Sequence, residues 1–193
     1  SKFMNWPHPT YTDSGGFQVL SLGAGFKKVL AMDTSGLSKE DIVAENSERR
    51  AFVDEDGVDF KSPLNGSKER FSAEISIGIQ HKIGADVIFT FDELTTLVDS
   101  RSYQEESLER TFRWAKRCVA EHERLTEKRK GKPYQALFGV LQGANYEDLR
   151  RKAARQISSL NVDGFGIGGS LEKKILGRIC RRAGKYGHCK KSV

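Results

Sequence analysis

Apolar and polar positions alternate in short runs over the first 70 residues, and glycine and aspartate separate these runs. The runs FQVLSL, KKVLAMD and RAFVDEDGVDFKSP are typical of strands and hairpins. Asp56 and Gly57 form a two-residue turn signal between AFVDE and VDFKS, which predicts a β-hairpin at this point. The N-proximal part of the chain is therefore expected to be mainly β-structure.

Residues 72–83 fit two different periodicities. Three isoleucines alternate over this segment as in a strand, but isoleucine also recurs every four residues, as in a helix. Ser72 is a suitable helix N-cap, Glu74 places an acidic group in the first turn, and Gly84 is a suitable stop. These end signals favour the helix.

From residue 86 onward, strand patterns alternate with helix patterns. DVIFTF, ALFGVLQG and DGFGIGGS predict buried strands, and residues 103–130 and 146–160 predict amphipathic helices between them. The apolar stripe of the longer helix comprises Leu108, Phe112, Ala115, Val119, His122 and Leu125. Strand, helix, strand, helix, strand is the order of a parallel α/β sheet, and the pattern fits either a doubly wound fold or a barrel.

Composition indicates one globular domain. The chain has 193 residues, of which 37% are apolar, and contains four prolines. No run approaches the roughly 20 apolar residues of a membrane span, and the opening SKFMNWPHPTY lacks the layout of a signal peptide, so a cytoplasmic, non-membrane protein is expected. Cys118, Cys180 and Cys189 are odd in number and lack the spacing of a disulfide framework or a CxxC metal site.

The positive charge is concentrated at one end of the chain. The formal net charge is +6, and residues 172–193 contain eight Lys or Arg side chains but a single acidic one. Such a run binds phosphates by counterion release, but it is also typical of a solvated or disordered terminus. Charge alone is therefore weak support for an RNA partner.

Polar and glycine-rich groups follow each predicted strand. TDSGGFQ follows the opening strand, FDE follows VIFT, QG follows FGVL, and GG follows FGI. The carboxyl ends of parallel strands form the ligand face of α/β folds, so these four groups are expected to meet at one mouth.

In this order the four groups resemble the bacterial-type tRNA-guanine transglycosylase (queuine tRNA-ribosyltransferase) family. The resemblance covers about residue 3 to about residue 171 and includes GVDFKSPLNGSKERFSAEISIGIQHKIGADVIFTFDE, ERTFRWAKRC and LFGVLQGANYEDLR. It implies an α/β fold of the TIM (β/α)₈-barrel family. Such a barrel takes about 250 residues, so residues 1–171 are expected to be an incomplete barrel with an N-proximal hairpin region. Residues 172–193 are expected to be a basic tail that is non-native or disordered.

The resemblance implies exchange of guanine at the wobble position of a tRNA anticodon for a 7-deazaguanine precursor of queuosine. Asp92 then resembles the carboxylate that accepts hydrogen bonds from N1–H and the 2-amino group of the base. Gln142 and the backbone of Gly168 and Gly169 would donate to the opposite edge. Taken singly, Asp92 also suits a helix cap or an ion pair, Gln142 a surface position, and the glycine pair a tight turn.

The TDSGG motif supplies the remaining candidates. Asp13 matches the family's aspartate for proton transfer or for holding the base, and Phe17 would stack on the base. Ser14, Gly15 and Gly16 are expected to contact the substrate beside them. The alternative is that Asp13 and Ser14 only initiate a turn and that Phe17 belongs to the core. Glu93 either tunes its neighbour Asp92 or faces solvent.

The family works through a covalent ribose–enzyme intermediate formed by a downstream aspartate, followed by a zinc site. Cys180, His188 and Cys189 do not match its CxCxxC and His spacing, so the nucleophile and the zinc ligands are expected to be absent from this chain, as in a truncated product. The expected partners are tRNA, guanine or a 7-deazaguanine, and a second copy in a homodimer. The alternative function is a non-catalytic purine- or tRNA-binding module that completes its barrel with another chain.

Overall fold

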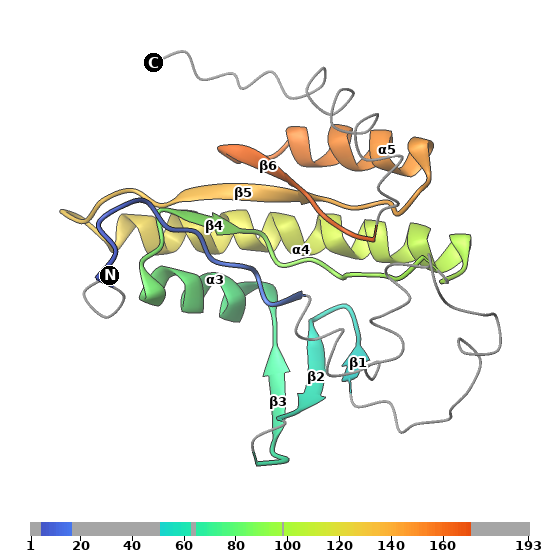
Figure 1. Ribbon diagram of the computed structural model, residues 1–193, viewed down its shortest axis with the longest axis horizontal. Helices are drawn as coiled ribbons and strands as arrows, with labels where there is room; N and C mark the ends of the chain where they lie inside the picture. Colours follow the sequence, from blue (N-terminus) through green and yellow to red (C-terminus); the bar gives the residue numbers. More distant parts are fainter. Residues whose placement is uncertain (1–4, 17–50, 63–64, 98, 171–193) are drawn as a thin grey trace.

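A computed structural model describes residues 5–16, 51–62, 65–97 and 99–170 of the chain (Figure 1). The predicted runs FQVLSL and KKVLAMD and the predicted basic tail lie outside these residues. Its helices and strands are β1 (Ala51–Val53), β2 (Val58–Lys61), β3 (Lys68–Phe71), α3 (Ala73–Ile83), β4 (Val87–Phe89), α4 (Arg101–Glu127), β5 (Ala136–Leu141), α5 (Glu147–Ser158) and β6 (Gly164–Ile167).

The second half of the described chain forms a parallel sheet in the order β4-β5-β6. Ile88 pairs with Leu137 in one ladder, and Val140 pairs with Gly166 in the next. Helices α4 and α5 form the crossovers, which confirms the predicted parallel strand–helix alternation. Tyr11 bridges Val87 in parallel, and Figure 1 shows the N-terminal segment running beside β4. Neighbouring parallel strands occur in doubly wound sheets as well as in barrels, so the TIM barrel stays a prediction.

A separate antiparallel sheet has the order β1-β2-β3 and projects from the amino end of α3 (Figure 1). The hairpin predicted around Asp56 and Gly57 is confirmed, but its two-residue turn is wrong. Val53 pairs with Val58, so the loop contains four residues. Its conformation is stabilised by Asp54, whose Oδ1 accepts hydrogen bonds from the backbone N–H groups of Asp56 (2.8 Å) and Gly57 (2.9 Å).

The ambiguous segment after this sheet is the helix α3, as its end signals predict. Ser72 Oγ accepts the backbone N–H of Ile75 at 3.3 Å, and Gly84 ends the helix in a left-handed conformation with φ of 79°. The helix buries Ala73, Ile77 and Gln80 at helical spacing. The fourfold repeat of isoleucine instead marks the exposed side of α3, where Ile83 is 62% exposed.

The Gln80 side chain takes the place of a backbone strand partner for Phe89. Its Oε1 accepts the Phe89 N–H at 2.9 Å and its Nε2 donates to the Phe89 carbonyl at 2.8 Å. The same Oε1 accepts the Thr12 hydroxyl at 2.9 Å, and Nε2 also donates to Ser76 Oγ at 3.1 Å. One side chain of α3 therefore joins the N-terminal segment to β4.

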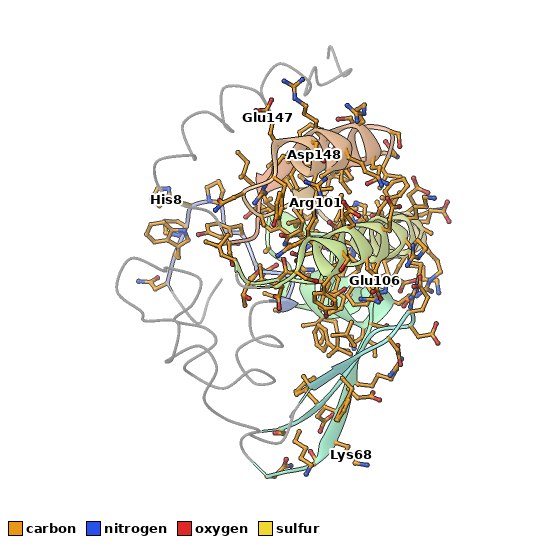
Figure 2. All side chains as sticks on the ribbon, turned by 90° about the vertical axis from the view of Figure 1, so that its right-hand side faces the viewer. His8, Lys68, Arg101, Glu106, Glu147 and Asp148 are labelled. Carbon is orange, nitrogen blue, oxygen red and sulfur yellow. The ribbon has the colours of Figure 1, made fainter. Side chains whose placement is uncertain are left out.

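Helix α4 is buried over a wider face than its predicted stripe. Leu108, Ala115 and His122 are buried as expected, but Trp114 and Cys118 are buried more deeply than Leu108 and His122, at 0% exposure. Arg101 at its start forms an ion pair with Asp148 of α5, so the two helices are also joined at the surface. Figure 2 shows these two residues far from Lys68, which lies in the projecting antiparallel sheet.

Trp114 connects three parts of the fold. Its ring stacks on Phe91, with centroids 4.9 Å apart and planes 14° from parallel. Its Nε1–H donates to the Glu55 carbonyl in the β1–β2 loop at 2.7 Å. Phe91 directly precedes Asp92, so this contact fixes the end of β4 against α4 and the hairpin.

Among the described residues, no helix is long and apolar enough to cross a membrane.

We predict that Trp114→Phe destabilises the chain by about 1 to 3 kcal/mol, because it leaves a cavity beside Phe91 and removes a buried hydrogen bond. Trp6→Phe is the matched control: Trp6 is 50% exposed, so its substitution is expected to change stability by no more than about 0.5 kcal/mol. Urea unfolding followed by circular dichroism measures both. Equal effects of the two substitutions would contradict the role of Trp114.

Candidate base-binding site

The polar groups that follow the parallel strands meet around Asp92. Ser14 follows the N-terminal segment that pairs with β4, Asp92 follows β4, and Gln142 follows β5. Ser14 Oγ donates to Asp92 Oδ1 at 3.0 Å, and Gln142 Nε2 donates to Asp92 Oδ2. The structure therefore brings together three of the four predicted groups through direct hydrogen bonds. The fourth, the Gly168–Gly169 pair after β6, lies against Gln142.

Asp92 is 8% exposed, and its environment raises its pKa to about 6. Burial is the largest cause, since removal from water disfavours the charged form. The hydrogen bonds from Gln142 and Ser14 oppose this effect, and the nearby charge of Asp13 adds to it. Asp92 is therefore a buried carboxylate whose pKa lies above the ordinary value of 3.8, a kind of shift that is enriched at functional sites.

Helix α3 holds the Asp13–Ser14 segment through a hydrogen bond. Ser76 Oγ donates to the Ser14 carbonyl at 2.6 Å, and Ser76 itself accepts from Gln80. Asp13 is exposed, and its Oδ1 accepts the backbone N–H of the next residue, Ser14, at 2.8 Å. Asp13 thus keeps a carboxylate at the surface of the site, while the Ser14 hydroxyl reaches inward to Asp92.

The glycines of this segment have different surroundings. A Cβ on Gly16 would lie 2.8 Å from the Asp92 carbonyl oxygen, so only glycine allows this approach. A Cβ on Gly15 would meet Phe71 at 3.1 Å, which places Gly15 against the antiparallel sheet and not against Asp92. Phe17, the predicted stacking residue, lies outside the described residues.

The Gly168–Gly169 turn packs against the Gln142 side chain. The Gly168 N–H donates to the Leu141 carbonyl at 3.0 Å, which ties the end of β6 to the end of β5. A Cβ on Gly169 would lie 2.2 Å from Gln142 Oε1, so a side chain here would displace that amide. Gln142 is 3% exposed, which excludes the surface position considered for it. Its Oε1 has no hydrogen-bond partner within the described part of the chain.

Glu93 is a structural partner of α4 and does not face solvent. It is 5% exposed, accepts the Tyr103 hydroxyl at 2.6 Å, and forms an ion pair with Arg110. Its backbone N–H also donates to Thr111 Oγ1 at 3.1 Å. These bonds anchor the loop after Asp92 to the amino-terminal half of α4, so the solvent-facing alternative was wrong.

Sequence reasoning missed three buried polar residues around this site, namely Ser76, Gln80 and Arg150. Ser76 and Gln80 share one side of α3 with Ala73 and Ile77, and Arg150 lies three residues before Ala153 on the inner side of α5. A polar residue at helical spacing within an apolar face is the signal that would have found them. Such a residue is buried only if it has partners, which are not visible in the sequence.

Comparison with known proteins decides the family. The sequence model described as Queuine tRNA-ribosyltransferase matches residues 1–178. The chain belongs to this family. It is 43% identical over 168 residues to the queuine tRNA-ribosyltransferase of Herpetosiphon aurantiacus and 41% identical over 169 residues to that of Shouchella clausii. The enzyme of the same name from Staphylococcus aureus strain N315 is 40% identical over 168 residues.

Each of these alignments covers 87% of this chain but only 34 to 36% of the relative. The chain therefore spans about a third of the length of these queuine tRNA-ribosyltransferases. It includes the segments that surround Asp92.

The zinc site that the family resemblance implies is not formed by the described residues. No three His, Cys, Asp or Glu side chains gather there in a metal-binding group. Cys118 is fully buried, and its burial raises the pKa of the thiol to about 12. Cys180, His188 and Cys189 lie outside the described residues.

We predict that Asp92→Asn stabilises the chain near neutral pH. The folded pKa of about 6 is above the ordinary value of 3.8, so the folded state holds its proton more tightly and wild-type stability falls as pH rises between these values. Asparagine removes the buried charge and keeps partners for Ser14 and Gln142 once the Gln142 amide turns over.

The expected gain is on the order of 1 to 3 kcal/mol at about pH 7.5 and close to zero at about pH 4. Urea unfolding of both proteins at the two pH values measures it. A difference that does not depend on pH would show that the Asp92 charge is not what destabilises the wild type.

Proposed function

We propose that this chain forms the base-recognition part of a tRNA-guanine transglycosylase, which exchanges guanine at the wobble position of a tRNA anticodon for a 7-deazaguanine precursor of queuosine. The observation that supports this most is the buried carboxylate of Asp92, with Gln142 beside it and the Gly168–Gly169 turn behind Gln142. Membership of the queuine tRNA-ribosyltransferase family supports the same reaction.

Recognition of the base follows from the groups that surround Asp92. A carboxylate offers two oxygens, and guanine presents N1–H and the 2-amino group side by side on one edge. For this pairing, the base replaces Gln142 as the donor to Asp92 Oδ2. The released Gln142 amide is then available to the acceptors O6 and N7 on the opposite edge. Gly168 already donates to Leu141, so Gly169 is the candidate for a backbone donor.

Asp13 is proposed as the group that transfers a proton or holds the base during exchange. Its carboxylate is exposed next to Ser14, whose hydroxyl touches Asp92, so it borders the buried acceptor without competing for its donors. Phe17 is proposed to stack on the base, since it directly follows the closely packed Gly16. Ser14 and Gly16 shape the pocket around Asp92, whereas Gly15 supports the segment from the side of Phe71.

The remaining expectations belong to the same proposal. The described strands form part of a TIM barrel, the protein is cytoplasmic, and its partner is tRNA. A homodimer is the proposed assembly. The covalent nucleophile and zinc of the family are assigned to no described residue.

Binding of a series of purines tests this proposal. Guanine and 7-deazaguanine are expected to bind, hypoxanthine to bind about tenfold or more weakly because it lacks the 2-amino donor, and adenine not to bind detectably, since it lacks both donors. Isothermal titration calorimetry with the purified chain measures all four. Asp92→Asn is expected to abolish binding of guanine, while Asp59→Asn, an exposed change in β2, is expected to leave it intact.

Similar affinities for guanine and adenine would reject Asp92 as the acceptor of the base edge. So would guanine binding that survives Asp92→Asn unchanged.

An exchange assay separates the enzyme from the alternative, a non-catalytic purine- or tRNA-binding module. The full-length gene product is expected to incorporate radiolabelled guanine into tRNA, and Asp13→Ala is expected to abolish incorporation. Asp56→Ala, in the exposed β1–β2 loop, serves as the control and is expected to retain it. Guanine binding without incorporation by the full-length product would select the binding module.

A further inference from the structure

We propose that Arg150 is a positioning residue for the base pocket. Its guanidinium holds together the ends of β5 and β6 and thereby sets the position of Gln142 and the Gly168–Gly169 turn. The inference rests on the proposed function insofar as these groups bind a base. It adds a role for a residue of α5 that lies behind the pocket.

Arg150 donates to three backbone carbonyls, which belong to three different segments of the chain. Nη1 donates to the Leu141 carbonyl at the end of β5 (2.7 Å) and to the Gly168 carbonyl after β6 (2.6 Å). Nε donates to the Ala144 carbonyl in the loop before α5 at 2.8 Å. A planar guanidinium with several fixed donors suits such a junction, whereas the compact ammonium of lysine does not.

This guanidinium is buried without a carboxylate partner. Arg150 is 6% exposed, and no Asp or Glu of the described residues forms an ion pair with it. Burial lowers its pKa to about 10, so the side chain stays charged at neutral pH. A buried cation requires compensation, and carbonyl oxygens provide it here. The positive φ of Ala144, 45°, belongs to the loop that presents one of these oxygens.

The three carbonyls adjoin the groups that the proposed function uses. Leu141 directly precedes Gln142, and Gly168 directly precedes Gly169. The Leu141 carbonyl accepts both Arg150 Nη1 and the Gly168 N–H, and Nη1 also donates to the Gly168 carbonyl, so the guanidinium bridges the end of β5 and the turn after β6. Its Nη2 has no partner in the described part of the chain, and a Cβ on Gly169 would lie 3.3 Å from it.

The apolar packing of α5 is carried by other residues. Leu149, Ala153 and Ile157 are buried against α4 and β5. Arg150 is directed instead at the strand ends, and the polar groups there are close-packed around Gln142. A small shift of the Gly169 N–H would weaken its hydrogen bond to a bound base, because the energy of a hydrogen bond falls steeply as its length and angle depart from their preferred values.

Arg150→Lys tests this role, with Arg151→Lys on the same helix as the matched control. Arg151 pairs with Glu147 at the surface, so the control makes the same chemical change away from the pocket. Arg150→Lys is expected to weaken guanine binding by at least about tenfold and Arg151→Lys by less than about twofold, measured by calorimetry. Circular dichroism is expected to show that both variants are folded at the assay temperature.

Amide hydrogen exchange of Gly168 gives a readout that does not involve the base. Arg150→Lys is expected to accelerate exchange of this N–H by at least about tenfold, while the amides of Ile88 and Leu137 in the sheet interior stay as protected as in the wild type. If the wild-type chain does not bind guanine, the proposed function fails, and the exchange rates alone still decide whether Arg150 holds the turn.

Unchanged protection of Gly168, or unchanged guanine affinity in a chain that binds it, would overturn the role of Arg150. Arg150→Gln, which keeps side-chain donors without the charge, is the second variant. Loss of folded structure in both Arg150→Lys and Arg150→Gln would assign Arg150 to the stability of the fold and would also overturn the proposal.

Discussion

The Asp92 carboxylate constrains the whole arrangement, because a charge that is removed from water has to be met by hydrogen-bond donors. Its two donors come from Ser14 and Gln142, which are 78 and 50 residues away in the sequence. Satisfying one buried carboxylate therefore requires that the N-terminal segment, β4 and β5 end at the same place. Burial raises the pKa of Asp92, whereas the two donors that join these segments act to lower it.

The described helices and strands follow local signals closely. The N-cap of Ser72 and the stop at Gly84 resolve an ambiguous isoleucine pattern in favour of α3, since capping acts within a single turn and is visible in the sequence. The candidate site was predictable for a similar reason. Asp92, Gln142 and the Gly168–Gly169 pair follow strands, Ser14 follows a segment that bridges β4, and parallel strands bring their carboxyl ends to one edge. The turn after β1 was mispredicted because the Asp54 side chain, and not the Asp56–Gly57 pair alone, sets the loop length.

Contacts between distant segments were not predictable in this way. Glu93 is buried because Arg110 and Tyr103 reach it from α4, and a charged residue next to another in a sequence carries no sign of such partners. Arg150 is similar, since its partners are backbone carbonyls, which every residue has. Closure of a barrel is another property of this kind, because it depends on pairing between the first and last strands, beyond the range of neighbouring ones.

Gln80 determines how far the N-terminal segment pairs with β4. Parallel pairing between the N-terminal segment and β4 continues through Thr12 and Val87, and would next take up the N–H and carbonyl of Phe89. The Gln80 amide occupies both of these groups, so the ladder stops one residue before the candidate site. Beyond that point the two segments are no longer obliged to keep the narrow spacing of paired strands. A single glutamine thus ends the backbone pairing, and beyond it the two segments are joined through side chains, as by Ser14 Oγ and Asp92.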